Sequence, residues 1–340
     1  MAALASTLAS AAGWAQNNNV GVIAPKWVSE PVRYDADDPA IWINKTDPSK
    51  SLILGTDKDA DGALFLFGLD GKIRHDLTMR GLLRPNNVDV AYGVQLGGRK
   101  VDVAVVTERY AHRLRVYSLP DMRPIDGGGI PVFEQERARD VMGVALYTRA
   151  TDGALFAIVS RSDQFAPTNG YLHQYRLTDD GTGTLRGLKV RAFGSWSGRK
   201  EIEALSVDPI EAMVFASDET FGLRKYHADP SVEDADDEIA QFGLTGFARD
   251  QEGSAVFRRG KERPLLFVSD QQAGELRIFG LDGKPVGRVR ITALETDGID
   301  LTTTSLPGFP GGLLVAMSTD KTFHFYDLDT LLKAISPISQ

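Results

Sequence analysis

Short runs in which apolar and polar residues alternate recur along this chain, each with an aromatic residue near its end. Six copies align on their aromatic residues, which are Phe67, Tyr117, Tyr175, Tyr226, Phe279 and Tyr326. Successive aromatics are 50, 58, 51, 53 and 47 residues apart. Alternation with a period of two is typical of β-strands, and a repeat of about 50 residues is typical of propeller blades. The pattern therefore predicts six similar β-units.

Two further strands precede the aromatic strand in each unit. The nearer one is almost continuously apolar, as expected of a strand buried on both faces, and its copies are 52–54, 103–106, 156–159, 213–215, 265–268 and 313–316. The earlier one is the predicted innermost strand, at 40–43, 88–90, 143–147, 202–205, 254–257 and 298–301. A fourth strand follows in most units, for example at 188–193 and 286–291. These units predict an all-β fold, a six-bladed β-propeller.

The last unit lacks a good fourth strand, because the chain ends in the apolar segment 331–335. We expect the N-terminal segment 20–24 to join the last blade and close the ring, which removes an open sheet edge. The predicted organisation is a residual signal or disordered tail over residues 1–17 and a single propeller domain over residues 18–340. The alternative is two stacked β-sandwich domains, which six regular repeats disfavour.

Composition narrows the classes of function. The net charge of -8 disfavours a nucleic-acid partner, because phosphate backbones are held by an excess of Lys and Arg. A cysteine count of 0 excludes a thiolate zinc site and a cysteinyl-phosphate mechanism. No segment reaches the roughly 20 apolar residues of a membrane helix, so no membrane partner is expected. Residues 1–16 resemble the end of a secretory signal without its basic start, which predicts a secreted or periplasmic protein.

Acidic and amide residues fall at the same place in every unit. One set begins the innermost strands: Asp37, Asp38, Asn86, Asn87, Asp140, Glu201, Glu203, Asp250, Glu252 and Asp297. A second set ends the next strands: Asp57, Glu108, Asp163, Asp218, Glu219, Asp270, Gln271 and Asp320. Antiparallel neighbours place the start of one strand beside the end of the next. We therefore expect both sets at one mouth of the central channel.

Crowded carboxylates repel one another and need cations for neutralisation. Calcium accepts irregular coordination by about six to eight oxygens, which suits strand-end carboxylates, amides and carbonyls. The absence of cysteine and of clustered histidine disfavours zinc and copper. Three basic residues, Lys58, Arg109 and Arg161, fall in the same register and with bound cations would attract a phosphate-rich anion. Alternatively, each basic residue pairs with a neighbouring carboxylate.

Two segments carry a family resemblance. Residues 35–42, Asp-Ala-Asp-Asp-Pro-Ala-Ile-Trp, and residues 86–89, Asn-Asn-Val-Asp, resemble the two signature motifs of the β-propeller phytases. The similarity extends from Glu30 to Tyr326. The resemblance implies a six-bladed enzyme that binds several calcium ions for stability and activity. It also implies release of orthophosphate from phytate, which is inositol hexakisphosphate.

The resemblance also implies roles for individual residues. The carboxylates of a catalytic calcium cluster would be Asp37, Glu203, Glu219, Asp250, Glu252 and Asp297. A calcium site that ties blades together would use Asp38, the carbonyl of Pro39 and Asn87, and a further ligand would be Gln271. The residues similar to phosphate-binding ones are Lys58, Arg109 and Arg161, with Arg161 where the family usually has Lys.

Three departures from the family pattern qualify this expectation. Met142 stands where a phosphate-contacting Tyr is common, and Asp59 replaces a second basic residue after Lys58. The acidic run before residue 297 is short, so one calcium ligand is either absent or supplied by Glu295 or Asp300. These changes are expected to weaken calcium affinity or to shift substrate preference.

The expected mechanism is attack on phosphorus by a water whose pKa calcium lowers, without a covalent enzyme intermediate. Glu203 or Glu219 would orient that water, and none of the 5 His residues lies in a phosphohistidine motif. One alternative is a calcium-dependent propeller lactonase or esterase, which has less need of Lys and Arg at the mouth. Another is a non-catalytic propeller with purely structural calcium. The expected partner is a small phosphorylated molecule, phytate, bound by a monomer.

Overall fold

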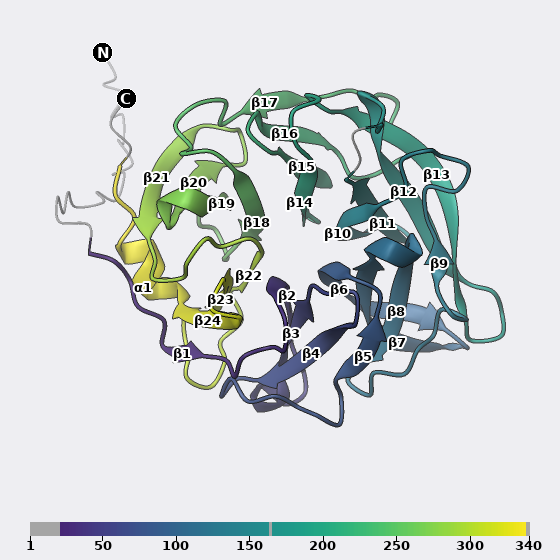
Figure 1. The fold of residues 1–340 in the computed structure, drawn as a ribbon, viewed down its shortest axis with the longest axis horizontal. Coiled ribbons are helices and arrows are strands. Elements are labelled where there is room, and N and C mark those ends of the chain that lie inside the picture. Colours follow the sequence, from purple (N-terminus) through teal and green to yellow (C-terminus); the bar gives the residue numbers. More distant parts are fainter. Residues whose placement is uncertain (1–20, 163–164, 338–340) are drawn as a thin grey trace, which may run out of the picture.

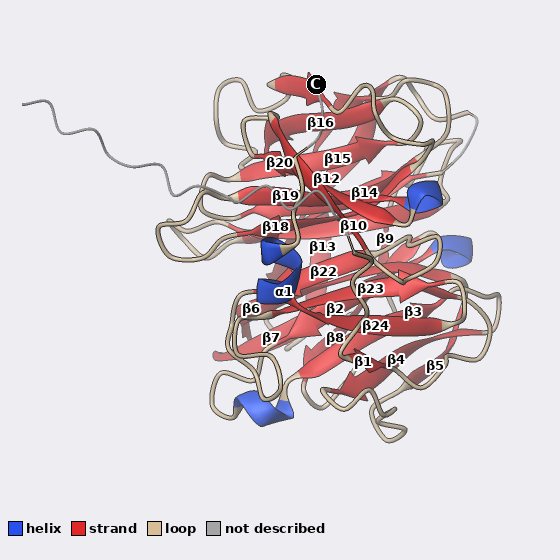
Figure 2. Cartoon of the chain, turned by 90° about the vertical axis from the view of Figure 1, so that its left-hand side faces the viewer, coloured by secondary structure: helices blue, strands red, loops and turns tan. Residues whose placement is uncertain are grey.

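The computed structural model describes residues 21–162 and 165–337, whose strands form six four-stranded antiparallel sheets arranged in a ring (Figure 1). The predicted six-bladed propeller is confirmed. Neighbouring strands of a blade are hydrogen-bonded in chain order, from the channel outward, in five of the blades. Seen from the side, the blades stack as layers of strands with few helices (Figure 2). The predicted tail over residues 1–17 and the expected mouth residue Asp163 lie outside the described residues.

Each blade contributes one strand to each of four concentric positions. The innermost strands are β2 (Ala36–Trp42), β6 (Pro85–Leu96), β10 (Val141–Thr148), β14 (Ile202–Asp208), β18 (Gln251–Phe257) and β22 (Ile299–Thr302). The second strands are β3 (Leu52–Asp57), β7 (Arg99–Glu108), β11 (Leu155–Arg161), β15 (Met213–Asp218), β19 (Leu265–Asp270) and β23 (Leu313–Ser318). The third strands are β4 (Gly62–Gly68), β8 (Arg113–Leu119), β12 (Asn169–Asp179), β16 (Gly222–His227), β20 (Glu275–Gly280) and β24 (Thr322–Asp327). The outermost strands are β5 (Met79–Leu82), β9 (Ile130–Pro131), β13 (Leu185–Ser195), β17 (Ala240–Phe242), β21 (Pro285–Arg290) and β1 (Trp27–Val28).

The hydrophobic core lies between blades rather than at one centre. In β7, Val103 and Val105 pack against the third blade, whereas Ala104 and Val106 pack against the first. All four side chains are fully buried. Because side chains alternate between the faces of a strand, a nearly continuous apolar run fills both interfaces. Burial of each large apolar side chain stabilises the fold by about 1.5–3 kcal/mol.

The ring closes in the last blade through the N-terminal strand, as predicted, but with different residues. Strand β1 pairs with β24, with Trp27 opposite Phe325, and completes the sheet β1-β24-β23-β22. The predicted closing segment, 20–24, was wrong. Its Ile23 makes a single parallel bridge to Ile291, and packs at the seam between the last two blades. Its apolar character therefore serves packing at that seam.

The C-terminal segment, for which no good strand was expected, forms the helix α1 (Leu328–Lys333). Asp327 caps this helix by accepting a hydrogen bond from the backbone N–H of Thr330 at 2.9 Å. Its residues Leu328, Leu331 and Leu332 are buried against the fifth and sixth blades. In the described part of the chain, no helix has the length and apolar character needed to cross a membrane.

Candidate active site

A β-bulge lies near the start of five innermost strands, at the mouth end. In β2 the pairing with β3 shifts between Ala36 and Pro39, so that both Asp37 and Asp38 lie in the bulge. The equivalent bulges contain Asn86 and Asn87, Met142 and Gly143, Glu203 and Ala204, and Glu252 and Gly253. A bulge redirects the side chains of adjacent residues. The side chains of most of the predicted acidic and amide residues at strand starts therefore do not follow the regular alternation of a strand.

Glycines at this level let the innermost strands of neighbouring blades approach closely. A Cβ atom on Gly143 would lie 1.8 Å from the carbonyl oxygen of Glu203, and one on Gly253 would lie 2.3 Å from that of Asp297. The N–H of Gly253 donates to the Asp297 carbonyl at 2.6 Å. Any side chain at these two positions would push the blades apart. The glycines thus help to bring the acidic residues around one mouth.

One side of the mouth holds two acids around a lysine, here called the Asp37 group (Asp37, Lys58 and Asp297). The Lys58 Nζ atom lies 2.5 Å from Asp37 Oδ1 and 3.4 Å from Asp297 Oδ2. Asn86 donates from Nδ2 to Asp37 Oδ2 at 3.2 Å, and Gln271 donates from Nε2 to Asp297 Oδ1. Burial alone would lower the pKa of Lys58, but the neighbouring carboxylates raise it above its usual value.

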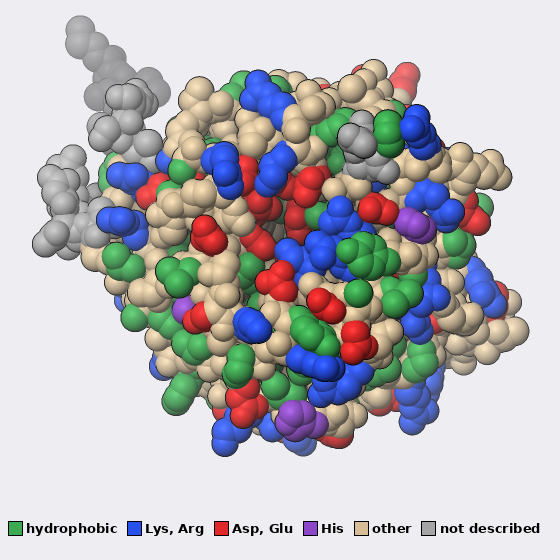
Figure 3. Space-filling model, viewed as in Figure 1, with side chains coloured by type: hydrophobic (Ala, Val, Ile, Leu, Met, Phe, Trp, Pro, Cys, Tyr) green, Lys and Arg blue, Asp and Glu red, His purple; other side chains and the backbone are tan. Residues whose placement is uncertain are grey.

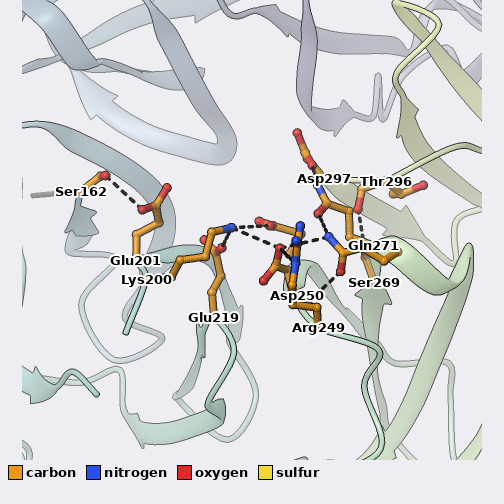
Figure 4. Close-up of polar contacts among 12 residues, drawn as sticks. Ser162, Lys200, Glu201, Glu219, Arg249, Asp250, Ser269, Gln271, Thr296 and Asp297 are labelled. Carbon is orange, nitrogen blue, oxygen red and sulfur yellow. Dashed lines mark hydrogen bonds and ion pairs between the residues drawn. The ribbon is translucent and has the colours of Figure 1, made fainter. Parts of the chain in front are cut away.

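The other side of the mouth holds three buried acids, here called the Glu219 group (Glu219, Asp250 and Glu252). One carboxylate oxygen from each lies within 4.8 Å of the others. Glu219 belongs to a second such cluster, with Glu201 and Glu203. Figure 4 shows Glu219 and Asp250 facing each other across the side chain of Lys200. Glu219 therefore links acids from two blades.

The acids of the mouth do not favour full ionisation. Burial, followed by the charge of Glu203, raises the pKa of Glu219 to about 8. Burial, followed by the charge of Asp37, raises the pKa of Asp297 to about 7. Burial is also the largest cause that raises the pKa values of Glu203 and Glu252 well above the ordinary range. These shifts are expected where carboxylates meet without enough positive charge.

Several buried oxygens near the mouth and channel have no hydrogen-bond partner among the described residues. They are Glu219 Oε1, Asp250 Oδ1, Asn86 Oδ1 and Asn87 Oδ1. Buried polar atoms in proteins are normally paired, so each of these oxygens is suited to a ligand. Carboxylate and amide oxygens are the donors that hard cations such as calcium prefer. The donor set at this mouth therefore fits calcium.

A second polar region lies inside the channel, below the bulges. Asp38, Pro39 and Asn87 line a cavity of about 430 Å³. Asp38 Oδ2 accepts a hydrogen bond from the N–H of Val88 at 2.9 Å and so joins β2 to β6. Asp300 lines the same cavity, and its Oδ2 accepts from the N–H of Ile41 at 2.8 Å. Of the residues predicted to tie blades together, Asp38 does bond across two blades, and the role of all three as calcium ligands stays a prediction.

The last residue of each second strand holds the loop that leads into the innermost strand. In five blades it accepts a backbone hydrogen bond from that loop. The pairs are Asp57 with Tyr34 at 2.8 Å, Glu108 with Leu83 at 2.8 Å, Asp218 with Ser197 at 2.8 Å, Asp270 with Ala248 at 3.0 Å and Ser318 with Leu294 at 3.1 Å. In two of these blades the residue that follows this position, Lys58 or Glu219, contacts charged groups of the mouth. We call the last position of each second strand the structural register and the position after it the mouth register.

Arg161 occupies the structural register, so the prediction that it shares a register with Lys58 and Arg109 was wrong. Its side chain is fully buried, with Nε donating to the carbonyl of Tyr171 at 3.0 Å and Nη2 to that of Gly170 at 2.8 Å. Its guanidinium therefore uses its donors inside the third blade. A role for Arg161 in phosphate binding stays a prediction that this geometry disfavours.

Ser162 takes the mouth position that had been expected for Arg161. Its Oγ accepts from Arg109 Nη2 at 2.9 Å and donates to Glu201 Oε2 at 3.3 Å. Arg109 also lies 3.6 Å from Asp140, and its side chain is 16% exposed. Arg109 and Lys58 therefore lie at the mouth, and basic and acidic side chains gather near the centre of the face seen in Figure 3.

Sequence reasoning missed residues that lie outside the strand register. Lys200 lies in the loop before β14 and approaches all three acids of the Glu219 group. Gln272 donates from Nε2 to Asp250 Oδ2 at 3.0 Å, and also to the predicted ligand oxygen of Gln271. The signal for Lys200 is its place directly before Glu201, at the entry of an innermost strand.

The departures from the family pattern also have defined places. Met142 is buried in the bulge of β10. Asp59 accepts a hydrogen bond from Asp61 within its own turn at 3.1 Å. Asp300 lies in the channel, where its carboxylate accepts hydrogen bonds from the backbone N–H groups of Ile41 and Leu301. It therefore does not supply a missing ligand at the mouth. Glu295 is exposed in the preceding loop.

Comparison with known proteins agrees with this geometry. The chain is 28% identical over 317 residues to a 3-phytase of Bacillus subtilis (strain 168), with 88% of this chain and 79% of the relative covered. A sequence model of the phytase family matches residues 2–324. Because this match spans nearly the whole propeller, including every predicted site residue, the chain belongs to the phytase family of hydrolases.

Proposed function

We propose that this enzyme hydrolyses phytate, releasing orthophosphate, and that the reaction depends on calcium. The observation that carries the proposal is the composition of one mouth. Two groups of buried acids share this mouth with the cationic side chains of Lys58 and Arg109, and among the described residues Glu219 Oε1 and Asp250 Oδ1 have no hydrogen-bond partner. Such a mouth combines donors for a hard cation with donors for a phosphate group.

Within this proposal, the protein's own residues have separable tasks. The carboxylates of Asp37, Asp297 and the Glu219 group would hold calcium, which would supply positive charge to offset the charge of the phosphate and would lower the pKa of a water. Lys58 and Arg109 hold phosphate oxygens through charge-assisted hydrogen bonds. Glu203 or Glu219 would orient the attacking water, and the raised pKa values of both carboxyl groups support this role. Arg161 is left out, because its donors are used inside the blade.

The channel residues have a different proposed task. Asp38, the carbonyl of Pro39 and Asn87 would hold a calcium that ties the first two blades. Asn87 Oδ1 has no hydrogen-bond partner in the described part of the chain, and burial is the first cause that raises the pKa of Asp38; both observations support a cation there. Removal of calcium would then weaken the fold as well as the reaction.

Export and oligomeric state are proposed from the sequence. The small-residue run within residues 1–16 favours a secreted or periplasmic protein, and we propose that it acts as a monomer. Cell fractionation and the molar mass measured by light scattering would test these two statements. Cytoplasmic retention of the mature chain, or a stable dimer, would contradict them.

The proposed activity is tested by measuring phosphate released from phytate. Purified protein is assayed with calcium and with a chelator. Phosphate release that stops on chelation and returns with added calcium is the expected result. Release that ignores the chelator would refute the calcium dependence, and hydrolysis of lactones without phosphate release would favour the lactonase alternative. The Glu203→Gln variant is expected to lose turnover while keeping the fold by circular dichroism.

A further inference from the structure

Lys200 reaches into the Glu219 group from the mouth. Its Nζ atom lies 2.5 Å from Glu219 Oε2, 3.2 Å from Asp250 Oδ2 and 3.7 Å from Glu252 Oε1 (Figure 4). The acid side chains are 1%, 0% and 6% exposed, whereas the Lys200 side chain is 42% exposed. A single ammonium group, held on a solvent-accessible stem, thus lies among three buried acids.

The ammonium leaves part of the Glu219 group unpaired. Glu219 Oε1 and Asp250 Oδ1 are buried and have no hydrogen-bond partner within the described ranges. An ammonium group donates at most about three hydrogen bonds, whereas calcium takes about six to eight oxygen ligands. The group therefore offers more oxygen atoms than Lys200 satisfies, and the same atoms suit a divalent ion.

Lys200 can leave this position more easily than Lys58 can leave the Asp37 group. The Lys58 side chain is 15% exposed, so most of it is already enclosed. The loop that carries Lys200 is held by other atoms: Trp196 Nε1 donates to the Lys200 carbonyl at 2.9 Å, and Arg199 Nη1 donates to the Thr220 carbonyl at 2.7 Å. The side chain can therefore turn into solvent while its backbone stays in place.

We propose that Lys200 is an internal counter-cation that holds the Glu219 group together without a divalent ion and leaves the group when such an ion binds. This inference rests on the proposed calcium dependence of the enzyme. Because the ion can bind only while the ammonium is away, its apparent affinity equals the intrinsic affinity multiplied by the fraction of time that the site is free. It also stabilises the ion-free protein, because three buried acids without a cation repel one another. Lys200 would thus tune the calcium concentration at which the mouth fills.

The Lys200→Met variant tests this competition, with Arg199→Met as its matched control. Both variants lose one positive charge from the same loop, but Arg199 bonds to a backbone carbonyl outside the Glu219 group. Calorimetric titration with calcium chloride should show tighter binding to Lys200→Met, by about tenfold if the ammonium occupies the site nine-tenths of the time. In chelator, its melting temperature should fall below that of the native protein. Equal gains in both variants, or an unchanged affinity in Lys200→Met, would overturn the proposal.

A second measurement uses the native chain and does not depend on how a variant folds. Lysine acylation by an N-hydroxysuccinimide acetate is followed by mass spectrometry of the peptide that contains Lys200. Calcium should raise the acylation rate at Lys200 several-fold, because the ammonium leaves the acids. An unchanged or lower rate would overturn the proposal. If the native protein binds no calcium and releases phosphate regardless of chelator, the proposed calcium dependence fails too, whereas calcium binding without these effects overturns only the role of Lys200.

Discussion

The guanidinium of Arg161 donates a hydrogen bond to the carbonyl of Ala138, 3.3 Å from Nη1. In the other five blades the hydrogen bond runs in the opposite direction. There, a side-chain oxygen at the end of the second strand accepts from a backbone N–H of the loop. Both arrangements fix the loop that leads into an innermost strand. The arginine therefore belongs to the support of the mouth rather than to its surface.

Replacement of Arg161 by methionine is expected to destabilise the protein without changing substrate affinity. The carbonyls of Ala138, Gly170 and Tyr171 would lose their donor, and each buried unsatisfied acceptor costs about 1–3 kcal/mol. Because the carbonyls of Ala138 and Tyr171 are the buried ones, we expect a loss of about 2–6 kcal/mol in the free energy of unfolding, measured by urea denaturation. The Michaelis constant for phytate should stay within about twofold of the native value.

Arg109→Met serves as the counterpart at the mouth. Its partners are Ser162 at 2.9 Å and Asp140 at 3.6 Å, so the free energy of unfolding should change by less than about 1 kcal/mol. Loss of a charge-assisted bond to phosphate should raise the Michaelis constant by about tenfold. If Arg161→Met raised that constant as much as Arg109→Met, Arg161 would be a phosphate-binding residue after all.

Glu219→Gln is expected to reduce phosphate release by at least about 100-fold, because Glu219 is shared by both acidic clusters. In chelator at pH 9 the variant should be at least as stable as the native protein. The reason is that burial raises the pKa of Glu219 to about 8, so its ionised form is unfavourable in the fold. Phosphate assays and thermal unfolding measure the two effects.

A suitable control for Glu219→Gln is Glu211→Gln. Glu211 follows β14 at the end opposite the bulge, where it pairs with Arg258 at 2.7 Å. This control should keep both activity and stability. Native activity in Glu219→Gln would contradict the proposed site.

Without calcium, the free energy of unfolding should decrease as the pH rises from about 4 to about 7. Burial, followed by the charge of Asp89, raises the pKa of Asp300 to about 7, well above its ordinary value in an unfolded chain. The folded state therefore binds this proton more tightly, and stability is lost as the proton leaves. The expected loss from Asp300 is roughly 2–4 kcal/mol. Urea denaturation in chelator should show a flatter dependence in Asp300→Asn, and an unchanged slope would contradict the assignment.

Calcium affinity should increase between pH 6 and pH 8. Bound calcium needs ionised ligands, and burial raises the pKa values of Asp297 and Glu219 to about 7 and about 8. Each proton released on binding contributes about tenfold in affinity per pH unit. Calorimetry in buffers of different ionisation enthalpy would count these protons. Binding that is independent of pH, with no proton release, would exclude both carboxylates as ligands.

The sequence by itself determined the blade count, the strand order and most of the mouth. The reason is that continuously apolar strands, such as the one from Val103 to Val106, must be buried on both faces between neighbouring blades. Six repeats of this pattern leave few possible arrangements. Because antiparallel strands exchange ends, the acids flanking them had to meet at one side. The places of Asp37, Glu219 and Lys58 at the mouth therefore follow from the order of residues along the chain.

Only the tertiary structure decided how neighbouring residues divide their tasks. Bulges send Asp37 to the mouth and Asp38 to the channel, and a bulge depends on the pairing partner rather than on local pattern. Ser162 takes the mouth position expected for Arg161, because Arg161 is the residue buried inside the third blade, where it meets the loop carbonyl. Lys200 reaches the acids from a loop without strand periodicity, so its contacts exist only once the blades are assembled.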